Sequence, residues 1–209
     1  MQLNRPGLIV LAALLIGELI LGLGVPLWML SHYNAGQSGA VVVTRPAIGG
    51  PFTLTATDGS TVTERTYRGK IVLIYFGYTY CPDACPTTLN EIAGALRELS
   101  PLAEHIQPLF ITIDPQRDTP QVLVEYVRSF DPRIAALTGS ESQIAAAARA
   151  YGVYYAKHKA EGVPDGYLID HTSVVFVMDQ DESFVAAFTP EASAAKMAER
   201  LRKLIAMTS

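Results

Sequence analysis

The chain has 209 residues, a net charge of −4 and only two cysteines. This length suits one folded domain with a short appendage. Acidic residues outnumber lysine and arginine, and the basic residues form no cluster, which argues against a nucleic-acid partner.

The first apolar segment is long enough to cross a membrane. Residues 8–30 contain a single charged side chain, Glu18. A spanning helix needs about 20 apolar residues, whereas the apolar region of a cleaved signal peptide has about 7–15. We therefore expect an uncleaved membrane anchor over residues 1–33. Glu18 is expected to be protonated or to face another helix, and the pattern leaves these two alternatives open.

Charge around this segment predicts its orientation. Arg5 precedes the segment, and no lysine or arginine follows it until Arg45. The positive-inside rule then places the amino terminus in the cytoplasm and the rest of the chain outside. The amino terminus lacks the arginine and serine of a mitochondrial transit peptide. These features favour a single-pass protein of a bacterial inner membrane, with its C-terminal domain in the periplasm, over a mitochondrial inner-membrane protein.

Residues 34–50 are expected to form a linker, and the folded domain to occupy residues 51–209. Asp58-Gly59 between two short β-type runs is a hairpin signal. Further along, Pro120 suits the first turn of a helix. In chain order we expect a hairpin (52–55 and 61–63), a strand (71–76), a helix (87–99), a strand (107–113), a helix (119–130), a short strand (134–137), a helix (141–151), an edge strand (153–156), a second hairpin (172–178 and 184–188) and a helix (191–205).

Strands that alternate with helices, and that are apolar on both faces, predict an α/β sheet flanked by helices on each side. The order opens with a strand–helix–strand unit and closes with a hairpin and a helix. This order is typical of a thioredoxin-like fold. Relative to that fold, the chain is predicted to have an N-terminal β-hairpin addition and an inserted helix and strand between its two halves.

Cys81 and Cys85 lie where a buried strand passes into a helix. Residues four apart share a helix face, so their sulfur atoms can approach each other or one ion. Unpaired N–H groups at the helix start favour a thiolate at Cys85. The pair suits either thiol redox chemistry or a soft metal such as Cu(I), and a metal would want a third ligand.

Four histidines are available as that ligand, namely His32, His105, His158 and His171. His171 immediately precedes an apolar strand. In a thioredoxin-like sheet the start of that strand packs against the cysteine loop. His171 is therefore the favoured third ligand, and the other three have no comparable position.

Three segments together resemble the Sco/SenC family. They are residues 77–86 (GYTYCPDACP), 112–120 (TIDPQRDTP) and 170–173 (DHTS). The resemblance covers the whole predicted domain and the anchor. Members of this family are thioredoxin-like, membrane-anchored copper-binding proteins that help to assemble the CuA centre in subunit II of cytochrome c oxidase.

The resemblance implies that Cys81, Cys85 and His171 bind copper, as Cu(I), Cu(II) or both. Asp114 resembles the acid that the family carries near its metal site, and Asp170 is expected to orient the site from outside the ligand set. Subunit II or a similar copper acceptor is the implied partner, together with a periplasmic copper donor or thiol reductase.

Two other functions remain as alternatives. One is a thiol–disulfide oxidoreductase that reduces the copper-ligand cysteines of the acceptor or acts in redox signalling. Against it, three residues separate the cysteines where redox-active thioredoxins have two, and His171 stands where those proteins place a proline. The other is a peroxiredoxin-like peroxidase, which Thr79 before Cys81 matches only loosely. The sequence thus favours a copper metallochaperone over an enzyme.

Overall fold

The computed structural model describes residues 48–208. The predicted anchor and the linker up to residue 47 lie outside the described residues. Within 48–208, no helix combines the length and the apolar character that a membrane span requires.

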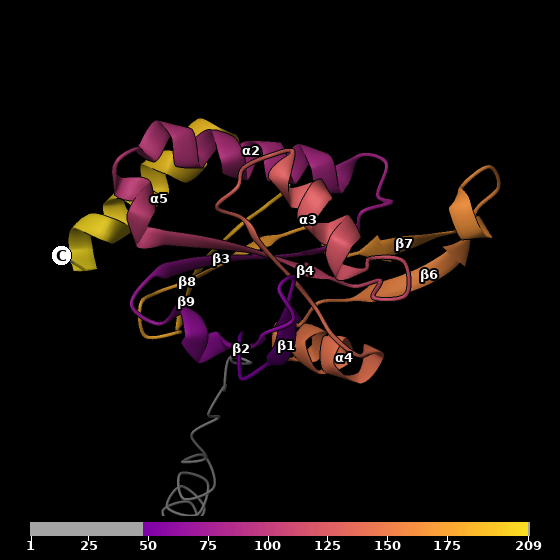
Figure 1. Cartoon of the computed structure of the whole chain (residues 1–209). Coiled ribbons are helices and arrows are strands. Elements are labelled where there is room, and N and C mark those ends of the chain that lie inside the picture. The colour runs from indigo at the N-terminus through magenta and orange to yellow at the C-terminus, as the bar shows by residue number, and fades with distance from the viewer. Residues whose placement is uncertain (1–47, 209) are drawn as a thin grey trace, which may run out of the picture. The chain divides into compact units, whose positions relative to one another are not determined.

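A seven-stranded mixed sheet forms the centre of the domain (Figure 1). Its strands lie in the order β2-β1-β5-β4-β3-β8-β9, in which β3 pairs with β4 and β4 with β5 in parallel, and the other pairs are antiparallel. The strands are β1 (Thr53–Ala56), β2 (Thr61–Thr63), β3 (Ile71–Gly77), β4 (Ile106–Thr112), β5 (Ala135–Thr138), β8 (Val175–Met178) and β9 (Phe184–Phe188).

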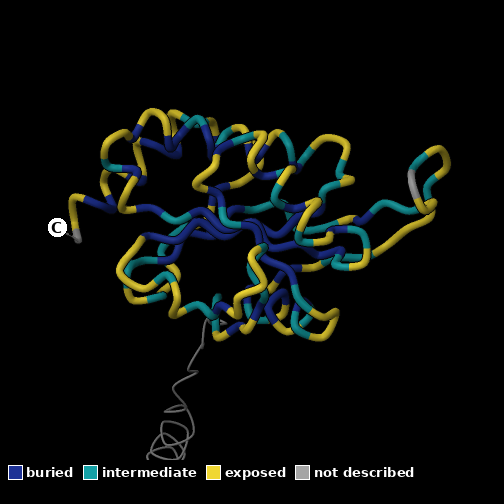
Figure 2. Tube along the Cα trace, viewed as in Figure 1, coloured by how far each residue is buried: buried dark blue, intermediate teal, exposed yellow. Residues whose placement is uncertain are grey.

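Helices cover both faces of this sheet. In Figure 1, α2, α3 and α5 lie on one side and α4 on the other. All seven residues of β3 are buried, which explains why this strand reads as a continuous apolar run (Figure 2). The helices are α2 (Ala84–Leu99), α3 (Pro120–Arg128), α4 (Glu141–Ala150) and α5 (Ala194–Thr208), with short 3-10 turns η1 (Glu64–Tyr67), η2 (Leu102–His105) and η3 (Pro164–Gly166).

The prediction of a thioredoxin-like α/β fold is confirmed. The N-terminal hairpin β1–β2 extends the sheet because β1 pairs with β5. The last residues of the predicted linker belong to the packed domain, since Ile48 contacts the core and Gly49 N donates to the carbonyl oxygen of Ala150 at 2.9 Å.

The largest difference from the prediction lies between α4 and β8. In place of a single edge strand at 153–156, β6 (Tyr155–Lys159) and β7 (Tyr167–His171) pair as a separate two-stranded sheet. This hairpin projects from one end of the domain, and its tip is exposed (Figures 1 and 2). The polar run Lys157-His158-Lys159 reads as a solvated loop because both faces of this stretch of β6 remain exposed.

Candidate metal centre

Three side chains from two distant parts of the chain meet at the carboxyl end of β3. The two Sγ atoms of Cys81 and Cys85 and a ring nitrogen of His171 all lie within 4.8 Å of one another. Cys85 Sγ lies 3.5 Å from His171 Nε2, and the Cys85 backbone N–H donates to Cys81 Sγ at 3.4 Å. Within residues 48–208 this is the one such group that could hold a metal ion.

The helix start differs from the prediction, and so does the ionisation of the cysteines. α2 begins at Ala84 rather than at residue 87, which places Cys85 inside its first turn, fully buried. A hydrogen bond from the Cys85 side chain lowers the pKa of Cys81 to about 4, while burial raises the pKa of Cys85. The burial of Cys85 thus opposes the effect of the helix N–H groups and favours the thiolate on the half-buried Cys81.

His171 is oriented by the backbone and by two tyrosine rings. Its Nδ1 lies 3.1 Å from the carbonyl oxygen of Thr172, so Nδ1 carries the proton and Nε2 turns its lone pair toward the sulfur atoms. The rings of Tyr75 and Tyr78 meet the imidazole edge-on, with centroids 6.2 Å and 5.9 Å away. The imidazole thus has the tautomer and the direction of a metal ligand.

Asp170 does not have the predicted place beside the cysteines. Its side chain is 74% exposed, and its carboxylate lies 3.3 Å from His158 Nδ1 on the neighbouring strand. Successive side chains of a strand point to opposite faces, so the inward direction of His171 turns Asp170 outward. The carbonyl oxygen of Thr172 takes the orienting role expected of Asp170.

Asp114 is fully buried and forms part of a polar cluster beside the site. Its carboxylate accepts hydrogen bonds from Arg117 Nε and, at 2.9 Å, from the hydroxyl of Tyr167. Lys157 Nζ lies 3.5 Å from the same carboxylate. Sequence reasoning singled out Asp114 but missed Arg117 and Tyr167, although Arg117 lies in the quoted segment 112–120.

Asp118 is a second buried acid that the sequence did not single out. Its carboxylate accepts from the hydroxyls of Thr79 and Thr112, each at 2.6 Å, and from Thr79 N at 3.1 Å. Burial raises the pKa of this carboxyl. Since Thr79 lies two residues before Cys81 and Thr112 ends β4, Asp118 ties the cysteine loop to the central sheet.

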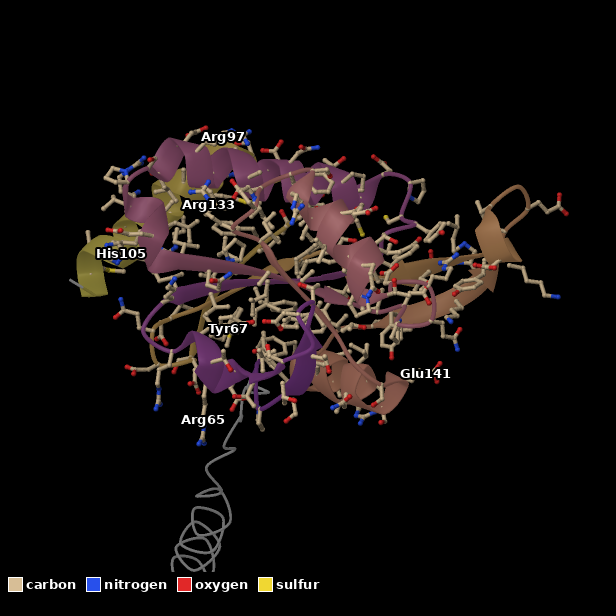
Figure 3. All side chains as sticks on the ribbon, in the orientation of Figure 1. Arg65, Tyr67, Arg97, His105, Arg133 and Glu141 are labelled. Carbon is tan, nitrogen blue, oxygen red and sulfur yellow. The ribbon has the colours of Figure 1, made fainter. Side chains whose placement is uncertain are left out.

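The other histidines and the residues flanking the cysteines take varied positions. His105 lies at the end of the domain away from the β6–β7 hairpin, at the start of β4 (Figure 3), and His32 lies outside the described residues. Tyr78 is buried against His171, while Tyr80 is 41% exposed and its ring lies 4.7 Å from the Arg117 guanidinium. Pro82 is exposed.

The residues present suit a soft metal ion. Two sulfur atoms and one imidazole nitrogen form a donor set that favours Cu(I) over hard cations. Tyr75 is fully buried beside Cys85. Burial raises the pKa of Tyr75, and the neighbouring Cys85 raises it further, so the Tyr75 hydroxyl lies close to the sulfur atom of Cys85. A metal-bound thiolate at Cys85 would accept a hydrogen bond from this hydroxyl.

Comparison with known proteins agrees with this geometry. The sequence model of the SCO1/SenC family matches residues 42–206. The chain belongs to the SCO1/SenC family. An SCO2-like protein of Rickettsia prowazekii is 37% identical over 203 residues, which cover 95% of this chain and 97% of that relative.

Solved structures of the family share the fold. The copper-bound crystal structure of Arabidopsis thaliana ScoI superposes with a TM-score of 0.72 at 39% identity, over 77% of this chain and 99% of that one. BsSco, described as a member of the Sco family of cytochrome c oxidase assembly proteins with a disulfide switch, superposes with a TM-score of 0.60 at 19% identity, over 79% of this chain and 95% of that one. At this low identity BsSco supports the fold alone.

Proposed function

We propose that this protein is a membrane-anchored copper metallochaperone. Cys81, Cys85 and His171 hold one copper ion, and the protein delivers it to, or prepares, the CuA site in subunit II of cytochrome c oxidase or a similar acceptor. The observation that carries the proposal is the meeting of two sulfur atoms and an imidazole nitrogen within 4.8 Å. Family membership and the copper-bound ScoI relative support it.

The site is chemically suited to transfer as well as to binding. Two thiolates and one neutral imidazole give a Cu(I) complex a net charge of −1. Cys81 is half-buried and lies beside the exposed Pro82, so the site can be reached from solvent on that side. An acceptor thiolate can therefore replace the chain's ligands one at a time.

A copper stoichiometry measurement tests this proposal. The full-length protein in detergent is reduced, loaded with Cu(I) without oxygen and freed of excess metal. We expect one ion per chain, no retained ion in the Cys81→Ala/Cys85→Ala double variant, and an affinity lower by at least about tenfold in His171→Ala. His158→Ala is the matched control and should bind as the wild type does. Wild-type affinity in His171→Ala would refute the ligand assignment.

A thiol–disulfide oxidoreductase is the second candidate, favoured by one observation. A low-pKa thiolate on the half-buried Cys81 beside a buried Cys85 thiol is the arrangement of an attacking and a resolving cysteine. In that reaction Cys81 and Cys85 form a disulfide, and an acceptor disulfide receives two electrons and two protons. The test is reduction of an oxidised acceptor by the copper-free protein. Reduction that persists in His171→Ala would favour this activity, because the two cysteines alone exchange bonds with the acceptor disulfide.

We also propose that residues 8–30 anchor the protein in a bacterial inner membrane with the folded domain in the periplasm. The argument rests on the apolar length and on the charge around it. Protease treatment of intact spheroplasts should cleave the domain while the membrane fraction keeps the amino-terminal piece after carbonate extraction. A protected domain would contradict this topology.

A further inference from the structure

The strand that carries His171 belongs to an appendage of the sheet. Within the described residues, β6 and β7 share no ladder with the seven-stranded sheet. Tyr167, Ile169 and His171 alternate along β7 and so share one face. Each of the three contacts the main body of the domain, and these contacts decide where the imidazole lies.

The first of the three contacts is a group formed by Asp114, Arg117 and Tyr167, here named the clamp. The Arg117 guanidinium lies 3.7 Å from the centroid of the Tyr167 ring, and its Nη1 donates to the Tyr167 carbonyl oxygen at 3.2 Å. Arg117 and the Tyr167 hydroxyl both donate to Asp114. The Asp114 and Arg117 side chains are 0% and 6% exposed, so the ion pair of the clamp is shielded from water and salt.

Tyr78 extends the clamp to His171. Its ring centroid lies 5.8 Å from the Arg117 guanidinium and 5.9 Å from the His171 ring. Its hydroxyl accepts from the backbone N–H of Ile169 at 3.2 Å. One buried tyrosine therefore touches the clamp, the middle of β7 and the imidazole.

The neighbouring strand is tied to the same acid. Lys157 of β6 lies 3.5 Å from the Asp114 carboxylate and donates to the side chain of Gln116 at 2.9 Å. Asp114 is thus shared by both strands of the hairpin. A ligand must be held within about 0.5 Å of its productive position, which a projecting hairpin can achieve only if it is fixed to the body in this way.

We propose that the clamp is the positioning group for His171. It holds the β6–β7 hairpin against the loop between β4 and α3, so that the imidazole reaches the two sulfur atoms. It thereby sets how long copper stays bound. This inference rests on the proposed function, because its consequence is measured on copper held by Cys81, Cys85 and His171.

The test compares two substitutions on the same strand in the full-length protein. Tyr167→Ala removes the ring beside Arg117 but keeps the Asp114–Arg117 ion pair. Asp170→Ala, the matched control, removes the exposed contact with His158 on the opposite face. In competition with a Cu(I) chelator we expect Tyr167→Ala to bind about tenfold more weakly, the lower end of the loss seen when a ligand's supporting contacts are removed. Asp170→Ala should bind as the wild type does.

A double-variant cycle separates positioning from a general loss of structure. In the His171→Ala background the clamp has no imidazole to place, so adding Tyr167→Ala should cause no further loss of affinity. Fully additive losses would overturn the proposal. In the metal-free protein, Tyr167→Ala should accelerate amide exchange at Ile169 and Thr172, whose N–H groups are bonded to Tyr78 and Tyr154.

The outcomes distinguish this inference from the proposed function. If the wild type binds no copper, both fail. If the wild type binds copper and Tyr167→Ala binds it equally tightly, only the clamp is overturned. Should Tyr167→Ala fail to fold, Tyr167→Phe removes just the hydroxyl that donates to Asp114, and it should show a smaller loss of affinity with the same non-additivity. Wild-type affinity in that variant would overturn the proposal as well.

Discussion

Gly77, the last residue of β3, leaves room for the sulfur atom of Cys85. We predict that a side chain at this position weakens both the fold and copper binding. A Cβ at this position would lie 2.8 Å from Cys85 Sγ, 2.8 Å from a ring carbon of Phe110 and 3.2 Å from one of Tyr75. Non-bonded carbon atoms prefer about 3.5–4.0 Å. In Gly77→Ala the methyl group therefore overlaps its neighbours by about 0.7 Å on two sides at once.

The surroundings have little freedom to relax. Cys85 and Phe110 are fully buried, and α2 packs against α5. Overpacking of this kind costs about 1–3 kcal/mol of unfolding free energy. For a chain of this size a loss of about 2 kcal/mol lowers Tm by roughly 4–8 °C. We further expect the Cu(I) affinity to fall about tenfold, because the sulfur of Cys85 is displaced from the other two donors.

Gly94→Ala is the matched control, measured with the same urea and thermal unfolding and the same chelator competition. Its Cβ would lie 2.7 Å from Ala194 Cβ, between α2 and α5. This position is also crowded, but neither cysteine sulfur nor the His171 ring lies within 4 Å of it. We expect this variant to lose stability, partly offset by the better helix propensity of alanine, and to keep its copper affinity. If both variants lose stability equally and neither loses affinity, the reasoning about Gly77 is refuted.

Two predictions concern ionisation. With a pKa of about 4, Cys81 in the reduced, metal-free protein should be alkylated at a rate that is constant between about pH 6 and 8. The buried Cys85 should stay unmodified. An alkylation rate that rises tenfold per pH unit would contradict the hydrogen bond between the two cysteines. Burial raises the pKa of Asp118 above its ordinary value of 3.8, so the fold favours the protonated carboxyl. The resulting stabilisation of the fold is present below pH 3.8 and is lost as the pH rises through the raised pKa. Asp118→Asn should remove that dependence from urea unfolding measured across the acidic range, and an unchanged pH profile would refute the assignment.

The elements could be predicted where the hydrophobic pattern was long and unambiguous. The run at 71–76 became β3, the run at 107–113 became β4, and Pro120 occupies the first turn of α3 as expected. The hairpin β6–β7 was missed because its exposed lysines follow neither a helical nor a strand pattern of burial. A strand that projects into solvent leaves little hydrophobic signal.

The ionisation and direction of individual side chains depend on tertiary packing, which the local sequence pattern does not reveal. Cys85 was expected to carry the thiolate because of its helix position, but its burial reverses the preference. Asp170 was expected near the metal because it adjoins His171, but strand alternation sends the two to opposite faces. In both cases the burial and direction of the side chain were the missing information.

Residue chemistry was enough to name two soft sulfur donors, since donor type is a property of each side chain. His171 was favoured among four histidines by its place in the expected fold and by the family resemblance. Only the folded chain joins Asp114 and Arg117 to Tyr167, some fifty residues further on, and only it sets the protonation of the two cysteines. Contacts of this kind arise when β7 packs on the loop after β4, and they depend on burial and on which face of a strand turns inward. Local sequence encodes the donors, whereas tertiary packing decides how they are held.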